Sequence, residues 1–358
     1  MKDDIFILIL ILSIFVACTQ NNVEIDGGVI HFVNDKPRFD KKPFVELEKL
    51  YDISNRTSNY YIVEPRYFDV DSDTSLYVLE PFENCVYVFN SKGSFIRKMG
   101  ETGDGPSELR NSRFINIVDD IIYITEKNKG VKVWDLNGKY IDYIVGNKTL
   151  AKSIIYMDSI FGLKVTGRKE NGEDIIGFEI GKYTKEFEKI NRILHVEFEE
   201  SKRKGYFPLF IPVNSKGDVF FPADRDKYII KKYDTNGKII KSFGREYKRK
   251  PHSEKYKKLF NERKKYNPGL KYHKHPSIIN GIFIDNNDLV WVAVGEWGEG
   301  EIDLFNSDGK LLYSFICPFI SGTAIFRYNR LYSIKTVDEE NKIITVFQLK
   351  YNFDVQNW

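Results

Sequence analysis

The fold of this chain is decided by a repeated stretch that first occurs as VYVFNSKGSFIRKMG at residues 86–100. The pattern returns as VKVWDLNGKYIDYIV at 131–145, IKKYDTNGKIIKSFG at 230–244 and IDLFNSDGKLLYSFI at 302–316. In each copy, two runs of alternating apolar residues flank a turn that contains Asn or Asp and then Gly. Alternation predicts half-buried strands, and the glycine accepts the positive φ of a tight turn. Each copy is therefore predicted to be a β-hairpin.

Two further short strands precede most of these hairpins, so the repeating unit has four antiparallel strands. Residues 67–100, YFDVDSDTSLYVLEPFENCVYVFNSKGSFIRKMG, show one whole unit. Four short strands repeated every 45 residues or so are typical of a β-propeller blade. Repeats between residues 60 and 350, interrupted at 245–275, leave about 43 residues for each of six blades. The sequence thus predicts an all-β, six-bladed β-propeller over 44–358, with an open solenoid or two β-sandwiches as alternatives.

The last blade, at about residues 321–350, shows three strands where the pattern needs four. The best source of the missing strand is FVELEKLYDI at 44–53, far away at the other end of the repeats. Such a closure would remove two free sheet edges, which otherwise invite aggregation. We therefore expect the ring to be closed by an N-terminal strand.

The composition is that of a folded β-protein. Of the 358 residues, 42% are hydrophobic, 29% are charged and 15% are aromatic, which excludes wholesale disorder and favours strands over helices. The three cysteines are too few for a disulfide scaffold, and Cys85 and Cys317 are expected to be separate buried thiols. A net charge of +3 excludes a globally basic protein of the nucleic-acid-binding type.

The near-neutral total conceals a basic insert at 245–275, where 12 Lys and Arg face three acidic residues. Ser253 is a predicted helix cap, Pro268-Gly269 a predicted end, and Tyr256, Leu259, Phe260 and Tyr266 fall near one face. The insert is predicted to contact an anionic partner, such as a glycan or lipid phosphate, or an envelope protein. A solvated helical lid is the alternative. The cations assigned to this contact are Lys248, Arg249, Lys257, Lys258, Arg263 and Lys264.

The N-terminus indicates export and lipid attachment. Residues 5–17 form an apolar run of 13, shorter than the roughly 20 that a membrane-spanning helix needs. Phe15-Val16-Ala17-Cys18 resembles a bacterial lipobox, although Phe15 replaces the usual Leu and Asp3 and Asp4 follow Lys2. We expect 1–17 to be a removed signal peptide, Cys18 to be acylated and 18–43 to be a tether. A short buried strand or an uncleaved anchor remains the alternative.

The chain resembles six-bladed propellers related to NHL repeats, in particular lipoprotein members from Bacteroidetes-type bacteria. Three features carry the likeness: Cys18, the repeated VxVxNxxGxxI strands, and MGETGDGPSELRNSRFINI at 99–117. That last stretch looks like the family's G-x-x-G-x-G-P-x-E-[LF] connection between blades. The resemblance covers about residues 44–350 and implies the fold and an envelope location at a periplasmic or outer-membrane surface. It implies no activity, because propellers include binding proteins, scaffolds and enzymes.

The predicted binding site lies on the face where strand-two-to-three loops and inter-blade connections surround the central channel. Acids, arginines and aromatics gathered there would bind a glycan or peptide, because aromatic faces stack on it and charged groups hold its polar atoms. For each residue, a solvated loop rim is the alternative, and Trp297 has a second one, packing over a neighbouring blade. The residues assigned to the channel mouth are Glu80, Phe82, Glu126, Arg113, Arg168, Arg225, Glu296 and Trp297.

No catalytic motif, cofactor or metal site is predicted. Asp69, Asp71, Asp73 and Glu80 have the spacing of a calcium loop, but Thr74 replaces the required glycine, and a hairpin turn capped by Asp explains the run more simply. The leading hypothesis is a non-catalytic, monomeric binding or scaffold protein without nucleic acid as a partner. The alternative is a metal-dependent hydrolase or lyase that uses Glu80, Glu126 and Glu296 in the channel.

Overall fold

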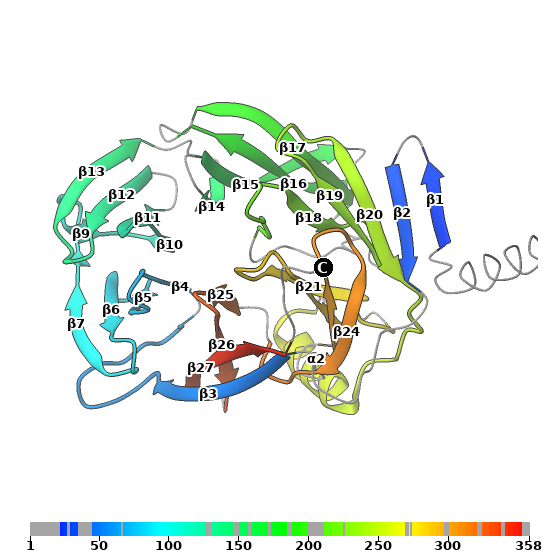
Figure 1. Ribbon diagram of the computed structural model, residues 1–358. Coiled ribbons are helices and arrows are strands. Elements are labelled where there is room, and N and C mark those ends of the chain that lie inside the picture. Colours follow the sequence, from blue (N-terminus) through cyan, green and yellow to red (C-terminus); the bar gives the residue numbers. More distant parts are fainter. Residues whose placement is uncertain are drawn as a thin grey trace, which may run out of the picture.

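The computed structural model arranges the chain as six blades around a central axis (Figure 1). Four consecutive strands pair antiparallel in most blades, and the predicted all-β, six-bladed architecture is confirmed. The structure describes residues 22–26, 29–34, 45–65, 67–126, 130–145, 150–156, 159–170, 173–184, 188–199, 211–224, 226–268, 272, 274–296, 301–320, 324–337 and 341–352. Residues 1–21, with the predicted signal peptide and Cys18, lie outside these ranges.

The first three blades follow the predicted four-strand plan. The first contains β4 (Tyr67–Val70), β5 (Leu76–Glu80), β6 (Cys85–Phe89) and β7 (Phe95–Met99). The second contains β10 (Ser112–Val118), β11 (Ile121–Glu126), β12 (Gly130–Asp135) and β13 (Tyr140–Val145). The third contains β14 (Leu150–Tyr156), β15 (Ser159–Glu170), β16 (Glu173–Tyr183) and β17 (Lys189–Glu199). Between the first two blades, β8 (Glu101–Thr102) pairs parallel with β9 (Glu108–Leu109).

The fourth blade recruits the N-terminal segment at its outer edge. Its own strands are β18 (Val219–Pro222), β19 (Ile229–Tyr233) and β20 (Ile239–Arg245), and Val213 bridges Val219 on the inner side. Outside β20 lie β2 (Val29–Asn34), which pairs parallel with it, and then β1 (Asn22–Asp26) (Figure 1). Part of the segment expected as a tether therefore adds a hairpin to the propeller.

The ring closes as predicted. The fifth blade contains β21 (Ile279–Ile284), β22 (Val290–Val294), β23 (Glu301–Phe305) and β24 (Leu311–Ile316). The sixth contains β25 (Ile325–Arg327), β26 (Arg330–Thr336) and β27 (Lys342–Tyr351). Its fourth strand is β3 (Val45–Ser54), which runs antiparallel to β27 from Val45 opposite Tyr351 to Ser54 opposite Ile343 (Figure 1).

The repeated hairpin turn forms for the reason that the sequence suggests. Asn90 Oδ1 accepts hydrogen bonds from the N–H groups of Lys92 and Ser94, at 3.0 and 2.9 Å. Gly93 completes the turn with a φ of +82°, a conformation that side-chain-bearing residues rarely adopt. Asp135, Asp234 and Asn306 cap the corresponding turns in the same way. These turns fix the register of the two outer strands of four blades.

The hydrophobic core lies between neighbouring blades. Trp134 and Trp291 are fully buried in two different clusters, each of which joins strands of adjacent blades. Cys85 and Cys317 are buried, free and in separate clusters, which confirms the prediction of two unpaired thiols. Burial raises the pKa of Cys85 to about 12 and that of Cys317 to about 11. Both thiols are therefore held in the neutral form at ordinary pH.

The basic insert contains α2 (Glu254–Tyr266), between the fourth and fifth blades in sequence. Among the described residues, no helix is long and apolar enough to cross a membrane.

Candidate functional site

The helix of the basic insert begins and ends where the sequence predicts. The Ser253 side chain accepts a hydrogen bond from the Tyr256 N–H at 3.2 Å, and Asn267 ends the helix before Pro268. Phe260 is buried, but Leu259 is 42% exposed and Tyr266 is 91% exposed. The packed face therefore centres on Phe260 and leaves the C-terminal end of the helix in solvent.

Glu296, immediately after β22, fastens the insert to the fifth blade. Its Oε2 accepts a hydrogen bond from the Ser253 N–H at 2.9 Å and lies 3.0 Å from Nδ1 of His252. Its Oε1 accepts a hydrogen bond from the Ser253 hydroxyl. Burial opposes ionisation, but the hydrogen bonds from Ser253 and His252 outweigh it and hold the pKa of Glu296 below its ordinary value. We call His252, Ser253 and Glu296 the insert latch.

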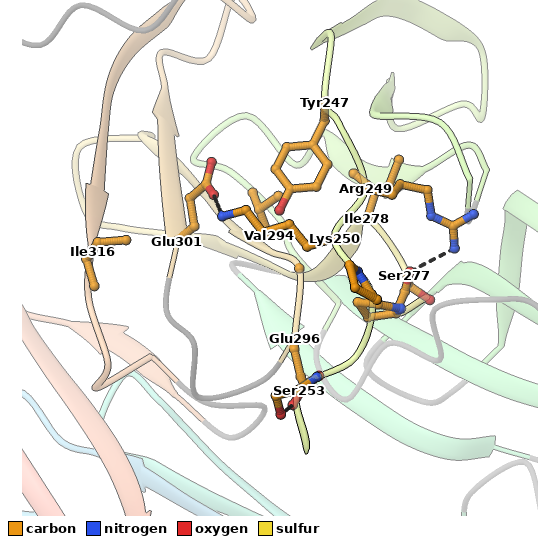
Figure 2. A pocket seen from close by; sticks show the side chains of 13 residues that line it. Tyr247, Arg249, Lys250, Ser253, Ser277, Ile278, Val294, Glu296, Glu301 and Ile316 are labelled. Carbon is orange, nitrogen blue, oxygen red and sulfur yellow. Dashed lines mark hydrogen bonds and ion pairs between the residues drawn. The ribbon is translucent and has the colours of Figure 1, made fainter. Parts of the chain in front are cut away.

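Ser253 and Glu296 of the latch line a pocket of about 240 Å³ between the insert and the fifth blade (Figure 2). Val294 and Gly295, at the end of β22, form the blade side, together with Glu301 at the start of β23. Segments on both sides of α2 form the insert side. The lining residues are Tyr247, Arg249, Lys250, Pro251, Ser253, Pro276, Ser277, Ile278, Val294, Gly295, Glu296, Glu301 and Ile316.

The pocket carries both signs of charge and one aromatic ring. Lys250 Nζ lies 3.8 Å from Oε2 of Glu301, and the lysine side chain is 77% exposed (Figure 2). Tyr247 is half-buried, and its hydroxyl lies close to Gly295, where a Cβ would stand 3.1 Å from the oxygen. Arg249 is held by Asp226 at 2.8 Å and by the Pro276 carbonyl at 2.9 Å. Arg249 is thus held in place, whereas Lys250 stays largely exposed beside Glu301.

Beneath the pocket, a buried ionic network orients two of its lining residues. Asp303 is fully buried and accepts hydrogen bonds from Arg245 Nε at 2.7 Å and from the Tyr228 hydroxyl at 2.6 Å. The Arg245 guanidinium also donates to Glu301 and lies 5.2 Å from the centre of the Tyr247 ring. Burial, together with the charge of Asp303, raises the pKa of Tyr228 well above its usual value, so this phenol remains a donor. Arg245 therefore positions both Glu301 and Tyr247.

Two of the residues assigned to the channel mouth hold loops together. Glu80 is fully buried, and its two oxygens accept hydrogen bonds from the N–H groups of Glu64 at 3.1 Å and Phe82 at 2.9 Å. Glu126 is 3% exposed and accepts a hydrogen bond from the Arg110 N–H at 2.8 Å. In both cases the carboxylate at the end of a blade's second strand binds the backbone of the preceding inter-blade connection.

The structure describes the side chains of five of the eight assigned residues. Phe82 is 72% exposed and Arg113 is exposed, while the side chain of Arg168, in β15, lies outside the described residues, as do Arg225 and Trp297. Of the five assigned residues whose side chains are described, only Glu296 lines the pocket. Glu80, Glu126 and Glu296, on which the hydrolase alternative depends, belong to separate hydrogen-bond networks.

The Asp-rich run of the first blade has the geometry of a capped hairpin. Asp71 accepts hydrogen bonds from the Ser75 N–H at 2.8 Å and the Tyr77 hydroxyl at 3.1 Å, and Asp69 accepts one from the Ile117 N–H at 2.9 Å. Burial raises the pKa of Asp71. Within the described residues, no group of three His, Cys, Asp or Glu side chains is placed to hold a metal ion.

The connection at 99–117 is a compact clasp. Lys132 Nζ donates hydrogen bonds to the carbonyls of Gly105, at 2.6 Å, and of Glu108, whose own Oε2 accepts the Gly105 N–H at 2.7 Å. A Cβ at Gly103 would collide with the Glu108 carboxylate. The glycines and the glutamate of the G-x-x-G-x-G-P-x-E pattern therefore serve the fold of the connection.

Sequence reasoning missed Tyr247, Ser277 and Glu301 as pocket residues. Tyr247 stands in the run REYKRK that begins at Arg245, where the basic residues predict a charged surface and nothing local indicates that the ring lines a pocket. Glu301 follows the loop that contains Glu296 and Trp297 and opens a strand. The sequence offers one signal that Glu301 has a specific role: it stands two residues before Asp303 in an otherwise apolar strand, so both carboxylates point to the same side of that strand.

Comparisons with known proteins agree with the fold. A family model described as "6-bladed beta-propeller" matches residues 69–153, as the resemblance of the repeats implied. No curated protein matches the sequence.

A Bacteroides fragilis protein described as exported superposes with a TM-score of 0.56 and 13% identity, over 90% of this chain and 99% of its own. A member of the duf4221 family from Bacteroides vulgatus superposes with a TM-score of 0.51 and 11% identity, over 86% of this chain and 99% of its own. A gluconolactonase from Xanthomonas campestris reaches a TM-score of 0.44 at 12% identity, over 81% and 88%. At these identities the likeness concerns the fold alone.

Proposed function

We propose that this chain is a non-catalytic binding protein of the cell envelope that holds one neutral sugar ring of a glycan in the pocket under the basic insert. The observation that carries the proposal is the pocket itself, where Tyr247, Lys250 and Glu301 line one small volume. An aromatic ring with a few fixed polar groups is the usual composition of a small-molecule site.

The mixed charge of the pocket favours a neutral ligand. Glu301 and Glu296 would repel an anion, and Lys250 and Arg249 would repel a cation. Sugar hydroxyls both donate and accept hydrogen bonds, so they suit an amine and a carboxylate placed 3.8 Å apart. The Tyr247 ring offers an apolar face beside a polar hydroxyl, which matches the two kinds of surface of a sugar ring.

The size of the pocket limits what enters it. Its volume of about 240 Å³ is below the roughly 300–1,000 Å³ of sites for drug-sized ligands. The pocket therefore receives one ring or one terminal residue, and the rest of a longer glycan would extend over the insert or past Ile316, which is 69% exposed.

The proposed location is outside the cytoplasm, at a membrane. The apolar run at 5–17 followed by Cys18 supports a cleaved leader and an acylated cysteine. The exported relative of similar fold from Bacteroides fragilis is consistent with this placement.

Titration calorimetry against glucose, galactose, mannose and N-acetylglucosamine tests the proposal. We expect at least one of these sugars to bind, and Tyr247→Ala to weaken that binding about tenfold because it removes the ring and its hydroxyl. Tyr266→Ala, which removes an exposed tyrosine of the same insert, is the matched control and should leave the affinity unchanged.

A second pair of variants tests the polar contact. Glu301→Gln should weaken sugar binding, whereas Glu262→Gln, on the exposed side of α2, should not. Binding that survives both pocket variants would refute the site. Binding of short peptides in place of all four sugars would refute the ligand class while preserving the pocket.

A further inference from the structure

Strand register brings the start of the described chain to the point where the basic insert leaves the propeller. Asn22 in β1 pairs with Val33 in β2, and Val33 pairs with Gly244 in β20. Neighbouring strands lie about 4.8 Å apart, so Asn22 is about 10 Å from Gly244. The insert begins at the next residue, Arg245. The N-terminal segment and the insert therefore leave the fourth blade at the same end (Figure 1).

The helix of the insert exposes a strongly cationic surface. Between Glu254 and Tyr266 there are six Lys and Arg residues and two Glu residues. Among the described residues, Lys257 pairs with Glu254, while Lys255, Lys258 and the run Arg263–Lys265 show no ion pair. Arg263 and Lys264 lie three and four residues after the buried Phe260, on its side of the helix, whereas Lys255, Lys258 and Lys265 lie on the other side. We call Lys255, Lys258 and Lys265 the cationic face.

Apolar groups accompany this charge in solvent. Tyr266, at the C-terminal end of α2, is 91% exposed, and Leu259 is 42% exposed. The opposite side of the helix is occupied, because Phe260 is buried and lies against Tyr272 with ring centres 5.1 Å apart. The helix is thus packed on one side, and its other side combines cations with a tyrosine and a leucine.

We infer that the cationic face of α2 lies on the anionic phospholipid surface to which Cys18 attaches the chain. The inference rests on the lipid anchor of the proposed function. Three residues lie between Cys18 and Asn22, and the four residue-to-residue steps of a fully extended chain span at most about 14 Å. The blade end that carries both β1 and the insert is therefore held against the headgroups. Cations near an anionic surface each strengthen attachment about fivefold, within a Debye length of about 8 Å.

A phospholipid surface fits this face better than a soluble polyanion. One acyl anchor gives weak, reversible attachment, and a basic helix supplies the second contact that stable attachment needs. Exposed Tyr266 and Leu259 suit the headgroup region, where amphipathic rings and apolar side chains are partly buried. A purely anionic polymer would use the cations and leave both of these side chains in water.

Trypsin digestion of the full protein, reconstituted in vesicles, tests the inference. We expect cleavage within residues 254–266 to be about tenfold slower in vesicles of phosphatidylcholine with 30% phosphatidylglycerol than in phosphatidylcholine alone. Sodium chloride at 0.5 M should abolish the difference, because it screens charges at the membrane surface. Equal cleavage in the two vesicles would overturn the inference.

A matched pair of triple variants assigns the effect to the helix. Lys255→Gln, Lys258→Gln and Lys265→Gln together should remove the protection at the trypsin sites that remain, Lys257, Arg263 and Lys264. The control set lowers the net charge equally and consists of Lys92→Gln, Lys139→Gln and Lys238→Gln. These lysines are exposed in the hairpin turns that precede β7, β13 and β20, whereas the insert follows the far end of β20. The control set should leave the protection from trypsin unchanged. Protection that survives the first set, or protection by soluble heparin without protection by anionic vesicles, would overturn the membrane assignment.

The lipid anchor is checked separately. The mass of the N-terminal peptide of the purified protein shows whether Cys18 is acylated. If it is not, the proposed anchoring fails, and sedimentation of the unanchored protein with the same two vesicle types then decides the role of the cationic face alone. Binding to anionic vesicles only would preserve that role, and binding to neither would refute it.

Discussion

Glu126 in the second blade and Glu296 in the fifth use the same contact for different purposes. Each follows or ends the second strand of its blade and accepts a backbone N–H from the preceding inter-blade connection. At Glu126 the connection is short and the carboxylate is 3% exposed. At Glu296 the connection carries the basic insert, and a pocket opens beside it. The same kind of contact therefore binds a short connection in one place and a helical insert in the other.

The comparison predicts the largest loss of stability at Glu126. Its carboxylate lies 4.0 Å from the ammonium group of Lys132, and both side chains are almost fully buried. Glu126→Ala leaves a buried cation and an unpaired Arg110 N–H, so we expect the free energy of unfolding to fall by about 3–5 kcal/mol. Urea denaturation followed by tryptophan fluorescence measures the change. Glu262→Ala, on the exposed side of α2, is the control.

Glu296→Ala should act locally. It removes the acceptor of the Ser253 N–H and hydroxyl, which we expect to weaken attachment of the insert by about 1–3 kcal/mol while the six blades remain folded. Limited trypsin digestion of the soluble protein should then cut within 248–266 at least tenfold faster, with little change in the main unfolding transition. A fall in global stability as large as that of Glu126→Ala would show that the insert unfolds together with the blades. Glu296 would then have the same global role as Glu126.

The sequence was sufficient to predict the blades and insufficient to predict the pocket beside Glu296. Alternation, the repeated Asn/Asp-x-x-Gly turns and the missing fourth strand predicted the blades and the closure by residues 44–53, because these are local patterns repeated many times. Ser253 as the cap of α2 was also predicted from local chemistry. All of these features were confirmed.

The pocket could not be predicted, because its contacts are long-range. Arg245 reaches Glu301 across 56 residues, and Tyr247 approaches Gly295 across 48. Glu80 and Glu126 resembled ligand-binding carboxylates because a sequence does not reveal which backbone N–H, 16 residues upstream in both cases, a buried side chain will meet. The basic insert was recognised by charge, and the ring that lines its pocket was not.

Ser253→Ala distinguishes the contribution of the Ser253 hydroxyl from that of its backbone N–H, and we expect a smaller effect than for Glu296→Ala. The variant removes the helix cap and the hydroxyl contact but keeps the backbone N–H that Glu296 accepts. Loss of an N-terminal cap costs about 1 kcal/mol, so we expect cleavage of the insert to increase about fivefold, less than in Glu296→Ala. The same trypsin digestion measures the cleavage rate. A rate equal to that of Glu296→Ala would show that the Ser253 hydroxyl accounts for the whole stabilising effect of the latch.

The smallest effect is a pH dependence confined to the fifth blade. The pKa of Glu296 is held below its ordinary value, chiefly by Ser253 and His252 against the opposing effect of burial. A group whose pKa falls on folding adds stability that is fully present above its unfolded pKa and is lost as pH drops through its folded pKa. The latch should therefore be intact at pH 6 and loosen below about pH 4. Hydrogen exchange at residues 253–256, corrected for the intrinsic rate, should show severalfold less protection at pH 3 than at pH 6. Glu296→Gln removes the titrating group and should flatten this dependence, and a profile that it leaves unchanged would assign the titration to another group.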